Sequence, residues 1–94
     1  MDMKFEWDNN KAQVNDDKHG VTFEEAQTVF ADPLAAIFDD ERHSDKETRE
    51  IIVGHSTANR LLLVCFTQRA EAVRLISARP ATKQERKDYE ENVS

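Results

Sequence analysis

Polar and apolar residues alternate at the beginning of the chain. The segment 3–7 (Met-Lys-Phe-Glu-Trp) has the period of two that predicts a short β-strand. The composition of 9–18 is compatible with a helix, although its apolar stripe is weak. Asp8 is a suitable N-cap for this helix, and Gly20 ends it because glycine adopts a left-handed conformation at little cost.

A second helix is predicted immediately afterwards. Thr22 and Glu25 have the spacing of a capping box, in which each side chain binds the backbone N–H group of the other residue. The apolar stripe of this helix consists of Phe23, Ala26 and Phe30. Asp32-Pro33 stops the helix, because the residue before a proline avoids helical backbone angles. The apolar run 34–38 then predicts a strand, and the polar, acidic segment 39–46 predicts a loop.

The second half of the chain contains the strongest strand pattern. The segments 50–54, 60–67 and 72–78 are rich in β-forming residues. Turn-forming residues separate these segments at 56–59 and 69–71. Three consecutive strands with such short connections predict an antiparallel meander.

A third helix closes the predicted fold. Thr82 and Glu85 form another capping box, which opens a polar helix that extends to about Asn92. The order β-α-α-β-β-β-β-α predicts an α+β fold with a mostly antiparallel sheet, a three-strand C-terminal meander, two N-terminal helices and one C-terminal helix. We expect the helices to lie on one face of the sheet. The length of 94 residues suits one domain, expected over 1–94.

The composition excludes several classes of protein. A net charge of −6 excludes a uniformly basic nucleic-acid coat protein. No apolar run approaches the roughly 20 residues that span a bilayer, and the N-terminus has no signal-peptide pattern. A single cysteine, Cys65, excludes a disulfide framework within the chain, and three irregularly spaced histidines are weak evidence for a metal site. We expect a cytoplasmic protein without membrane association, metal or cofactor.

Charge is unevenly distributed along the chain. The segment 51–82 carries four arginines and one acid, whereas 23–50 carries nine acids and three bases. The bases of the first segment are Arg60, Arg69, Arg74 and Arg79. The planar guanidinium fork suits phosphate or carboxylate groups, so 51–82 is a candidate anion-binding region. Two interpretations of 23–50 stay open: it can face away from a nucleic acid or hold the basic region of a partner.

Four groups of residues have a familiar order and spacing. They are Phe5-Glu6-Trp7-Asp8; Lys18-His19-Gly20-Val21 with Phe23-Glu24-Glu25-Ala26; Glu47-Thr48-Arg49 leading to Gly54; and Arg74-Leu75-Ile76-Ser77-Ala78-Arg79, followed by Ala81-Thr82, Glu85-Arg86 and Tyr89-Glu90. Together they resemble the BrnT family of bacterial type II toxins over nearly the whole chain. The resemblance implies a RelE-like fold and a toxin that cleaves RNA and inhibits translation. It also implies a BrnA-like ribbon-helix-helix antitoxin, through which the complex binds operator DNA.

RNA cleavage without a metal ion uses the ribose 2′-hydroxyl as nucleophile. It needs a base, an acid and cations that stabilise the charged phosphorane. The candidate phosphate clamps are Arg60, Arg74 and Arg79. The candidate acid–base groups are His19, His55 and Glu47, and the candidate substrate-binding residues are Lys18 and Arg49. His43 falls in the polar loop and is interpreted as a solvated residue.

Strand parity limits how these arginines can cooperate. In a regular strand, Arg74 shares a face with Ile76 and Ala78, whereas Arg79 shares the other face with Leu75 and Ser77. The two arginines therefore meet only if the strand is bulged or twisted between them. The register of Arg60 is not determined by the sequence.

Simpler interpretations stay open for each candidate. Lys18 and His19 can stabilise the negative end of a helix dipole, and Glu47 can form a local ion pair with Arg49. Cys65 has the setting of a core residue. Two other functions also stay open: a catalytically silent module that acts as co-repressor with a DNA-binding antitoxin, and an enzyme with another substrate, including RNA cleaved only on the ribosome.

Overall fold

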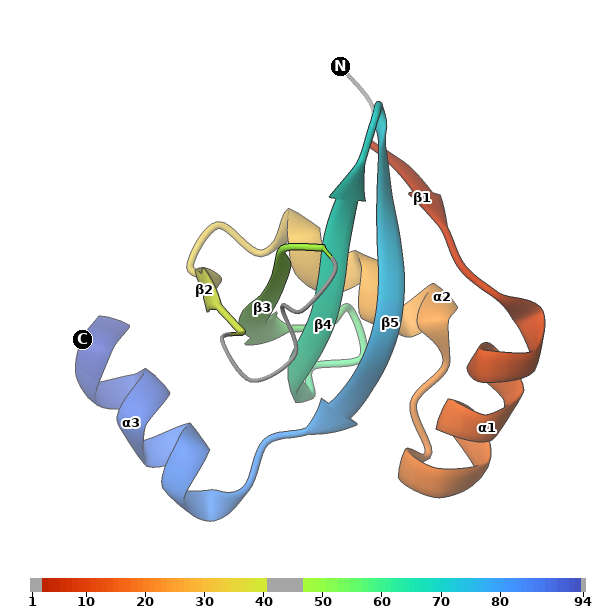
Figure 1. Ribbon diagram of the computed structural model, residues 1–94. Coiled ribbons are helices and arrows are strands. Elements are labelled where there is room, and N and C mark those ends of the chain that lie inside the picture. Colours follow the sequence, from red (N-terminus) through yellow and green to blue (C-terminus); the bar gives the residue numbers. More distant parts are fainter. Residues whose placement is uncertain (1–2, 41–46, 94) are drawn as a thin grey trace.

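A five-stranded sheet in the order β1-β5-β4-β3-β2 carries the fold (Figure 1). The computed structural model describes residues 3–40 and 47–93, so most of the loop expected over 39–46, including His43, lies outside the described residues. The elements are β1 (Lys4–Glu6), α1 (Asn9–His19), α2 (Phe23–Thr28), the 3₁₀ turn η1 (Val29–Ala31), β2 (Ala36–Asp39), β3 (Arg49–His55), β4 (Leu61–Arg69), β5 (Ala72–Pro80) and α3 (Lys83–Val93). This order confirms the predicted α+β class.

Strand pairing follows the predicted meander in the second half of the chain. The strands β3, β4 and β5 are consecutive and antiparallel, and β2 pairs antiparallel with β3 at one edge. At the other edge β1 pairs with β5 in parallel, so the sheet is mixed. The first strand is thereby placed beside the last one, which brings α1 next to β5.

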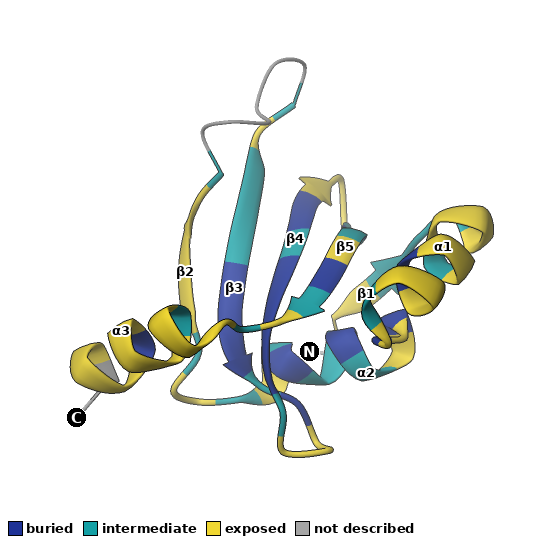
Figure 2. Ribbon diagram, turned by 90° about the horizontal axis from the view of Figure 1, so that it is seen from below, coloured by how far each residue is buried: buried dark blue, intermediate teal, exposed yellow. Residues whose placement is uncertain are grey.

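The helices cover both faces of the sheet, which corrects the expectation that all three lie on one face. The helix α2 lies on one side of the sheet and α3 crosses the other, while α1 lies at the edge beside β5 (Figures 1 and 2). The core under α2 includes Phe23, Ile52 and Val64, whereas Tyr89 of α3 packs against Val53. Successive residues of β3 and β4 are apolar on both faces, so each face needs a cover to remove it from water.

The predicted caps form with one difference. The Asp8 carboxylate accepts hydrogen bonds from the backbone of α1, and Gly20 has a left-handed φ of 68°. Thr82 and Glu85 bind one another reciprocally, at 2.9 and 3.1 Å. The Thr22 hydroxyl accepts the N–H of Glu25 at 3.0 Å, but the Glu25 carboxylate binds Arg60 instead of closing a box. The carboxylate of Glu25 accepts hydrogen bonds from Arg60 and from the Ser56 hydroxyl instead of completing the capping box.

One extra residue in β5 changes which side chains share a face. Cys65 of β4 pairs with Ser77, but the next residue, Phe66, pairs with Leu75, so Ile76 is the inserted residue of a β-bulge. Pairing resumes with Thr67 opposite Arg74. The bulge reverses the parity of the strand, so that Arg74, Ser77 and Arg79 all lie on the face that α3 covers.

Asn15 fastens α1 to the edge of β5 beyond the end of β1. Its amide nitrogen donates to the carbonyl oxygens of Ala78 and Val21, at 2.8 and 3.0 Å, and its amide oxygen accepts the N–H of Ala78 at 3.0 Å. Asn15 is buried, with 6% of its surface exposed. The side chain thus satisfies backbone groups at the strand edge where the pairing with β1 has ended.

We expect Asn15→Leu to lower the free energy of unfolding by about 2–4 kcal/mol, because it leaves two backbone groups of Ala78 without buried partners. Urea unfolding followed by circular dichroism measures the loss. Asn10→Leu is the matched control, because Asn10 is exposed on the same helix and only its backbone is hydrogen-bonded to Asp8. Equal stability of the two variants would contradict this role for Asn15.

Candidate functional site

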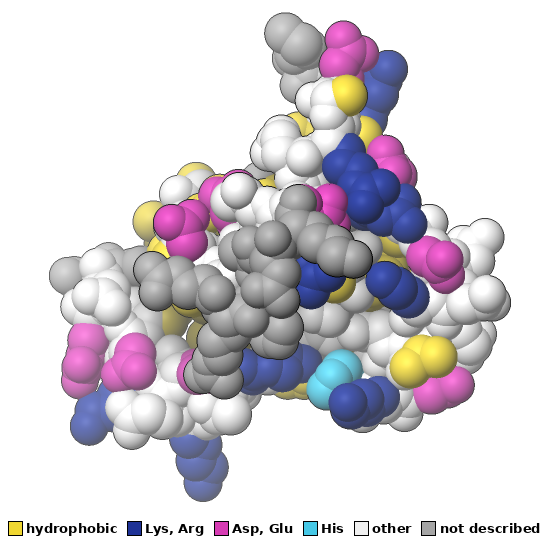
Figure 3. Space-filling model, viewed as in Figure 1, with side chains coloured by type: hydrophobic (Ala, Val, Ile, Leu, Met, Phe, Trp, Pro, Cys, Tyr) yellow, Lys and Arg dark blue, Asp and Glu magenta, His cyan; other side chains and the backbone are white. Residues whose placement is uncertain are grey.

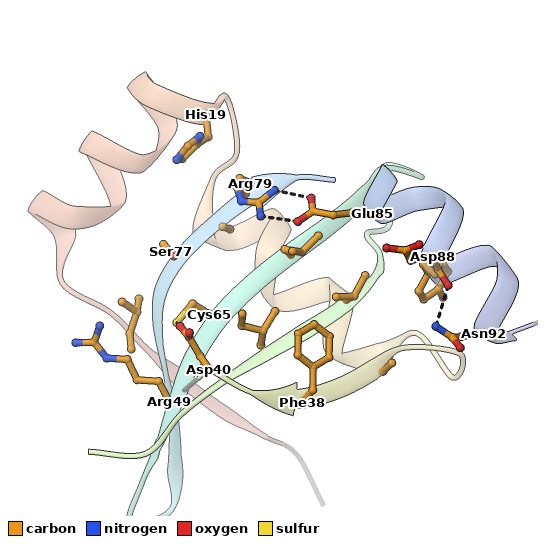
Figure 4. Close-up of a pocket in the computed structure, with 17 residues that line it drawn as sticks. His19, Phe38, Asp40, Arg49, Cys65, Ser77, Arg79, Glu85, Asp88 and Asn92 are labelled. Carbon is orange, nitrogen blue, oxygen red and sulfur yellow. Dashed lines mark hydrogen bonds and ion pairs between the residues drawn. The ribbon is translucent and has the colours of Figure 1, made fainter. Parts of the chain in front are cut away.

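A groove with a volume of about 670 Å³ lies between the sheet and α3 (Figure 4). The strands form its floor, α3 forms one wall, and the last residue of α1 lies at its border. The described residues that line it are His19, Ala36, Phe38, Asp40, Arg49, Ile51, Val53, Leu63, Cys65, Ile76, Ser77, Ala78, Arg79, Glu85, Asp88, Tyr89 and Asn92. This volume is within the range of small-molecule and substrate sites.

Arg79 and Glu85 form a bidentate ion pair in the groove. The two Nη atoms of Arg79 each donate to one oxygen of Glu85 at 2.7 Å, and Nη1 also donates to the Pro80 carbonyl at 3.3 Å. Hydrogen bonds from Arg79 outweigh desolvation and lower the pKa of Glu85 to about 2. The capping box of α3 fixes Glu85, and Glu85 in turn fixes the orientation of the guanidinium.

His19 faces this end of the groove from the C-terminus of α1. Figure 4 shows its ring on the same side of the groove as Ser77 and Arg79 of β5. A second hollow of about 330 Å³ adjoins the first and shares His19, Ile76 and Ser77 with it. Lys11 and Lys18 of α1 line this second hollow. The β-bulge therefore lies where the two hollows meet.

The other end of the groove is apolar and carries carboxylates at its border. Its floor contains Ile51, Val53 and Leu63, and Phe38 of β2 closes the edge. Cys65 lies between the two ends and donates a weak hydrogen bond to Asp40, with sulfur and oxygen 3.6 Å apart. Burial, followed by the nearby Asp40 charge, raises the pKa of the Cys65 thiol to about 11. The thiol is therefore protonated at neutral pH and is a poor nucleophile.

Arg60 lies on the opposite face of the sheet from Arg79. Its Nε donates to Glu25 at 2.9 Å, and its Nη2 binds both Glu25 and the Gly20 carbonyl. Hydrogen bonding from Arg60 lowers the pKa of Glu25, which remains ionised. Arg60 thus ties the β3–β4 turn to α2, and it is absent from the described lining of the groove.

His55 also lies outside the described lining of the groove. Its backbone N–H donates to Asp32 at 2.7 Å, and its ring packs edge-on against Tyr89. The hydrogen bond from His55 lowers the pKa of Asp32. The Tyr89 hydroxyl donates to the Leu34 carbonyl at 3.1 Å, so this cluster joins α3 to the segment before β2.

The remaining candidates are spread along the sheet. Arg74 shares the face of Arg79 but lies five residues earlier and donates to Glu6 at 2.8 Å. Glu47 pairs with Arg69 at 3.2 Å on the exposed end of the sheet. Arg49 lines the groove. Of the three predicted phosphate clamps, Arg79 is therefore the one that the structure places in the groove.

Basic side chains gather on the face that contains the groove. Strand register places Arg49, Arg69, Arg74 and Arg79 on this face of the sheet, and Lys11, Lys18 and His19 of α1 border it. Figure 3 shows Lys and Arg side chains over β5 and beside α1, with a histidine among them. We call these seven residues the basic face. The protein thus gathers these bases on one face despite an overall charge of −6, and Arg69, Arg74 and Arg79 each form an ion pair there.

Sequence reasoning missed Asn15, Phe38 and Glu85. Glu85 was identified only as a helix cap, and the six-residue separation between Arg79 and Glu85 is the signal that could have found their ion pair. Within residues 3–40 and 47–93, no three His, Cys, Asp or Glu side chains form a group that could hold a metal ion. In the same residues, no helix has the length and apolar character needed to cross a membrane.

Comparisons with known proteins identify the relatives of this chain. Residues 7–85 match the family model described as the ribonuclease toxin BrnT of type II toxin–antitoxin systems. The crystal structure of the Brucella abortus ribonuclease toxin BrnT is similar, with a TM-score of 0.67 and 27% sequence identity. The likeness covers 87% of this chain and 100% of that one. A search of the curated proteins finds no match.

We expect Glu85→Gln to lower the free energy of unfolding by about 1 kcal/mol at pH 7, the upper range for a partly exposed ion pair. Glutamine retains the capping geometry and removes the charge. Because folding lowers the pKa of Glu85 from its usual 4.5 to about 2, the stabilisation is complete above pH 4.5 and declines as the pH falls toward 2.

Urea unfolding at pH 7, 5 and 3.5 measures this difference, which should shrink at the lowest pH. Glu90→Gln is the control, because Glu90 is an exposed carboxylate of the same helix. A stability difference between parent and Glu85→Gln that stays constant across these three pH values would exclude the ion pair as its cause.

Proposed function

The chain belongs to the BrnT family of ribonuclease toxins from type II toxin–antitoxin systems, and we propose that it cleaves RNA without a metal ion at the His19–Ser77–Arg79 end of the groove. The observation that carries this proposal is the convergence of Ser77 and Arg79 of β5 with His19 of α1 at one end of the groove, on the face to which the β-bulge also directs Arg74. An arginine beside a histidine at one end of a groove suits a phosphodiester and a proton transfer.

The proposed reaction is attack of a ribose 2′-oxygen on the adjacent phosphorus. The bond between the 2′-oxygen and phosphorus forms, and the bond between phosphorus and the 5′-oxygen breaks. The products are a 2′,3′-cyclic phosphate and a free 5′-hydroxyl. His19 takes the proton of the 2′-hydroxyl and delivers it to the leaving 5′-oxygen, so the proton count is balanced.

Arg79 stabilises the charge that develops on the phosphorane oxygens. A guanidinium has five N–H donors, and the described contacts with Glu85 and Pro80 use three of them. The remaining two can reach a phosphate while Glu85 holds the group in place. A preorganised donor of this kind loses little freedom when the substrate binds.

The other basic residues bind flanking phosphates in this proposal. Lys18 lies beside His19, Arg49 lines the groove, and Arg74 continues the basic face along β5. Arg60 and His55 have structural roles through Glu25 and Asp32. Glu47 acts through its ion pair with Arg69.

A type II system includes an antitoxin, and we propose a BrnA-like ribbon-helix-helix protein as this partner. It would neutralise the toxin in the cytoplasm and carry the complex to operator DNA, whereas the free toxin would inhibit translation by cutting RNA. The nine acids of the segment 23–50 support a basic partner segment. The second candidate function, a silent co-repressor, is favoured by the occupation of both Nη atoms of Arg79 by Glu85.

We expect Arg79→Ala to slow RNA cleavage about 10²- to 10³-fold, because it removes a preorganised donor from the developing charge. His19→Ala should slow it about 10²- to 10⁴-fold through loss of proton transfer. The measurement is cleavage of naked RNA by the purified chain in the presence of chelator. Circular dichroism checks that each variant folds.

Arg86→Ala is the matched control, since it removes the same charge from an exposed position on α3. Full cleavage by Arg79→Ala would refute the proposed site. If the parent chain leaves naked RNA intact, the assay is repeated on translating ribosomes. Absence of cleavage there, with tight antitoxin binding, would support the silent co-repressor.

A further inference from the structure

The apolar end of the groove has a half-exposed aromatic ring that neither the core nor the proposed chemistry uses. Phe38 is 49% exposed, although it lies opposite Ile51 in the register of β2 and β3. Figure 4 shows the ring at the end of the groove away from His19, over the strands of the floor. Leaving an aromatic side chain half in water sacrifices part of its burial free energy, so a ligand that covers it gains that free energy.

Strand register gives the distance between the two ends. Phe38, Ile51, Cys65 and Ser77 lie in one row across four neighbouring strands. Three strand spacings of about 4.8 Å separate the backbone of Phe38 from that of Ser77 by roughly 14 Å. Both side chains reach into the groove and shorten this gap. A part of the RNA that contacts the Phe38 ring would therefore belong to a nucleotide close to the one whose phosphate lies at Arg79.

Carboxylates make this end of the groove a poor site for a second phosphate. Asp88 lines the groove here and repels a phosphate anion, and Asp40 adds a carboxylate beside Cys65. A carboxylate accepts hydrogen bonds from N–H groups, such as those on the edges of nucleobases. The amide of Asn92 adds a polar group at the same border. A flat, neutral group with N–H donors fits these surroundings.

We propose that the Phe38 end of the groove is a nucleobase subsite, in which the ring of Phe38 stacks on a base next to the scissile phosphate. This inference rests on the proposed ribonuclease function and adds a position at which the RNA is recognised. The partly buried Ile51 forms the apolar floor beneath the base, and Asp88 accepts from its edge. The substrate class is single-stranded RNA, because a stacked base must be free of a pairing partner.

The test measures binding separately from cleavage. A short RNA with 2′-O-methyl riboses keeps its bases and phosphates but lacks the attacking hydroxyl, and fluorescence anisotropy gives its Kd. Phe38→Ala should weaken binding about 5- to 150-fold, the loss of one base–aromatic stack. Phe38→Trp should retain affinity. Ile37→Ala is the matched control, since Ile37 is 54% exposed on the opposite face of the same strand.

A series of oligonucleotides with one abasic position identifies the stacked base. At one position, removal of the base should weaken RNA binding by the parent as much as Phe38→Ala does. Removal of the same base should cause no further loss of affinity in the Phe38→Ala variant. Unchanged affinity of Phe38→Ala, or additive losses at every position, would overturn the subsite. If Arg79→Ala loses RNA affinity while Phe38→Ala does not, the proposed function stands and this inference fails.

The antitoxin is the rival occupant of this surface. Weaker antitoxin binding by Phe38→Ala, with unchanged RNA affinity, would assign Phe38 to the partner interface and overturn the subsite. A parent chain that does not bind the RNA would overturn the subsite, whereas the proposed function is decided separately by the cleavage assay. Thermal unfolding of the Phe38 and Ile37 variants checks that they share the stability of the parent.

Discussion

The extra residue in β5 is the constraint on which the basic face depends. A regular strand would direct Arg74 and Arg79 to opposite faces, whereas the insertion of Ile76 directs both to the face under α3. Ser77 shares that face with Arg79 because the two residues are two positions apart in the strand. The bulge also lies where the two hollows meet, so the position of a single backbone residue decides whether the basic face is continuous.

Two further contacts hold the walls of the groove in place around this bulge. Asn15 binds the backbone of Ala78 and so sets the position of α1, which carries His19. Glu85 binds Arg79 and also caps α3. Each contact joins a helix to β5 within two residues of Ser77 or at Arg79 itself. The two helices therefore have fixed positions relative to the same strand.

Local signals in the sequence predicted much of this fold. The caps at Asp8 and Gly20, the Thr82–Glu85 box and the meander of the last three strands depend on neighbouring residues, and each is present. The placement of α3 was wrong, although the consecutive apolar residues of 51–53 and 61–66 already indicate strands that are buried on both faces.

The site was predicted only in part. Parity analysis of β5 identified the need for a bulge, but the inserted residue is decided by pairing with β4. The partner of Arg60 is Glu25, 35 positions away, and no local pattern indicates it. From the sequence, Phe38 was interpreted as an ordinary strand residue. The exposed fraction of its ring depends on how far neighbouring elements cover it, which the sequence does not indicate.

Asn15 links α1 to β5 through an amide, which neither gains nor loses a proton in water. The separation between His19 and the strand that carries Arg79 is therefore maintained by groups whose charge is the same in acid and in base. A change of pH therefore leaves this contact between α1 and β5 unaltered. The dependence of the reaction rate on pH would then report the ionisation of the reacting groups themselves.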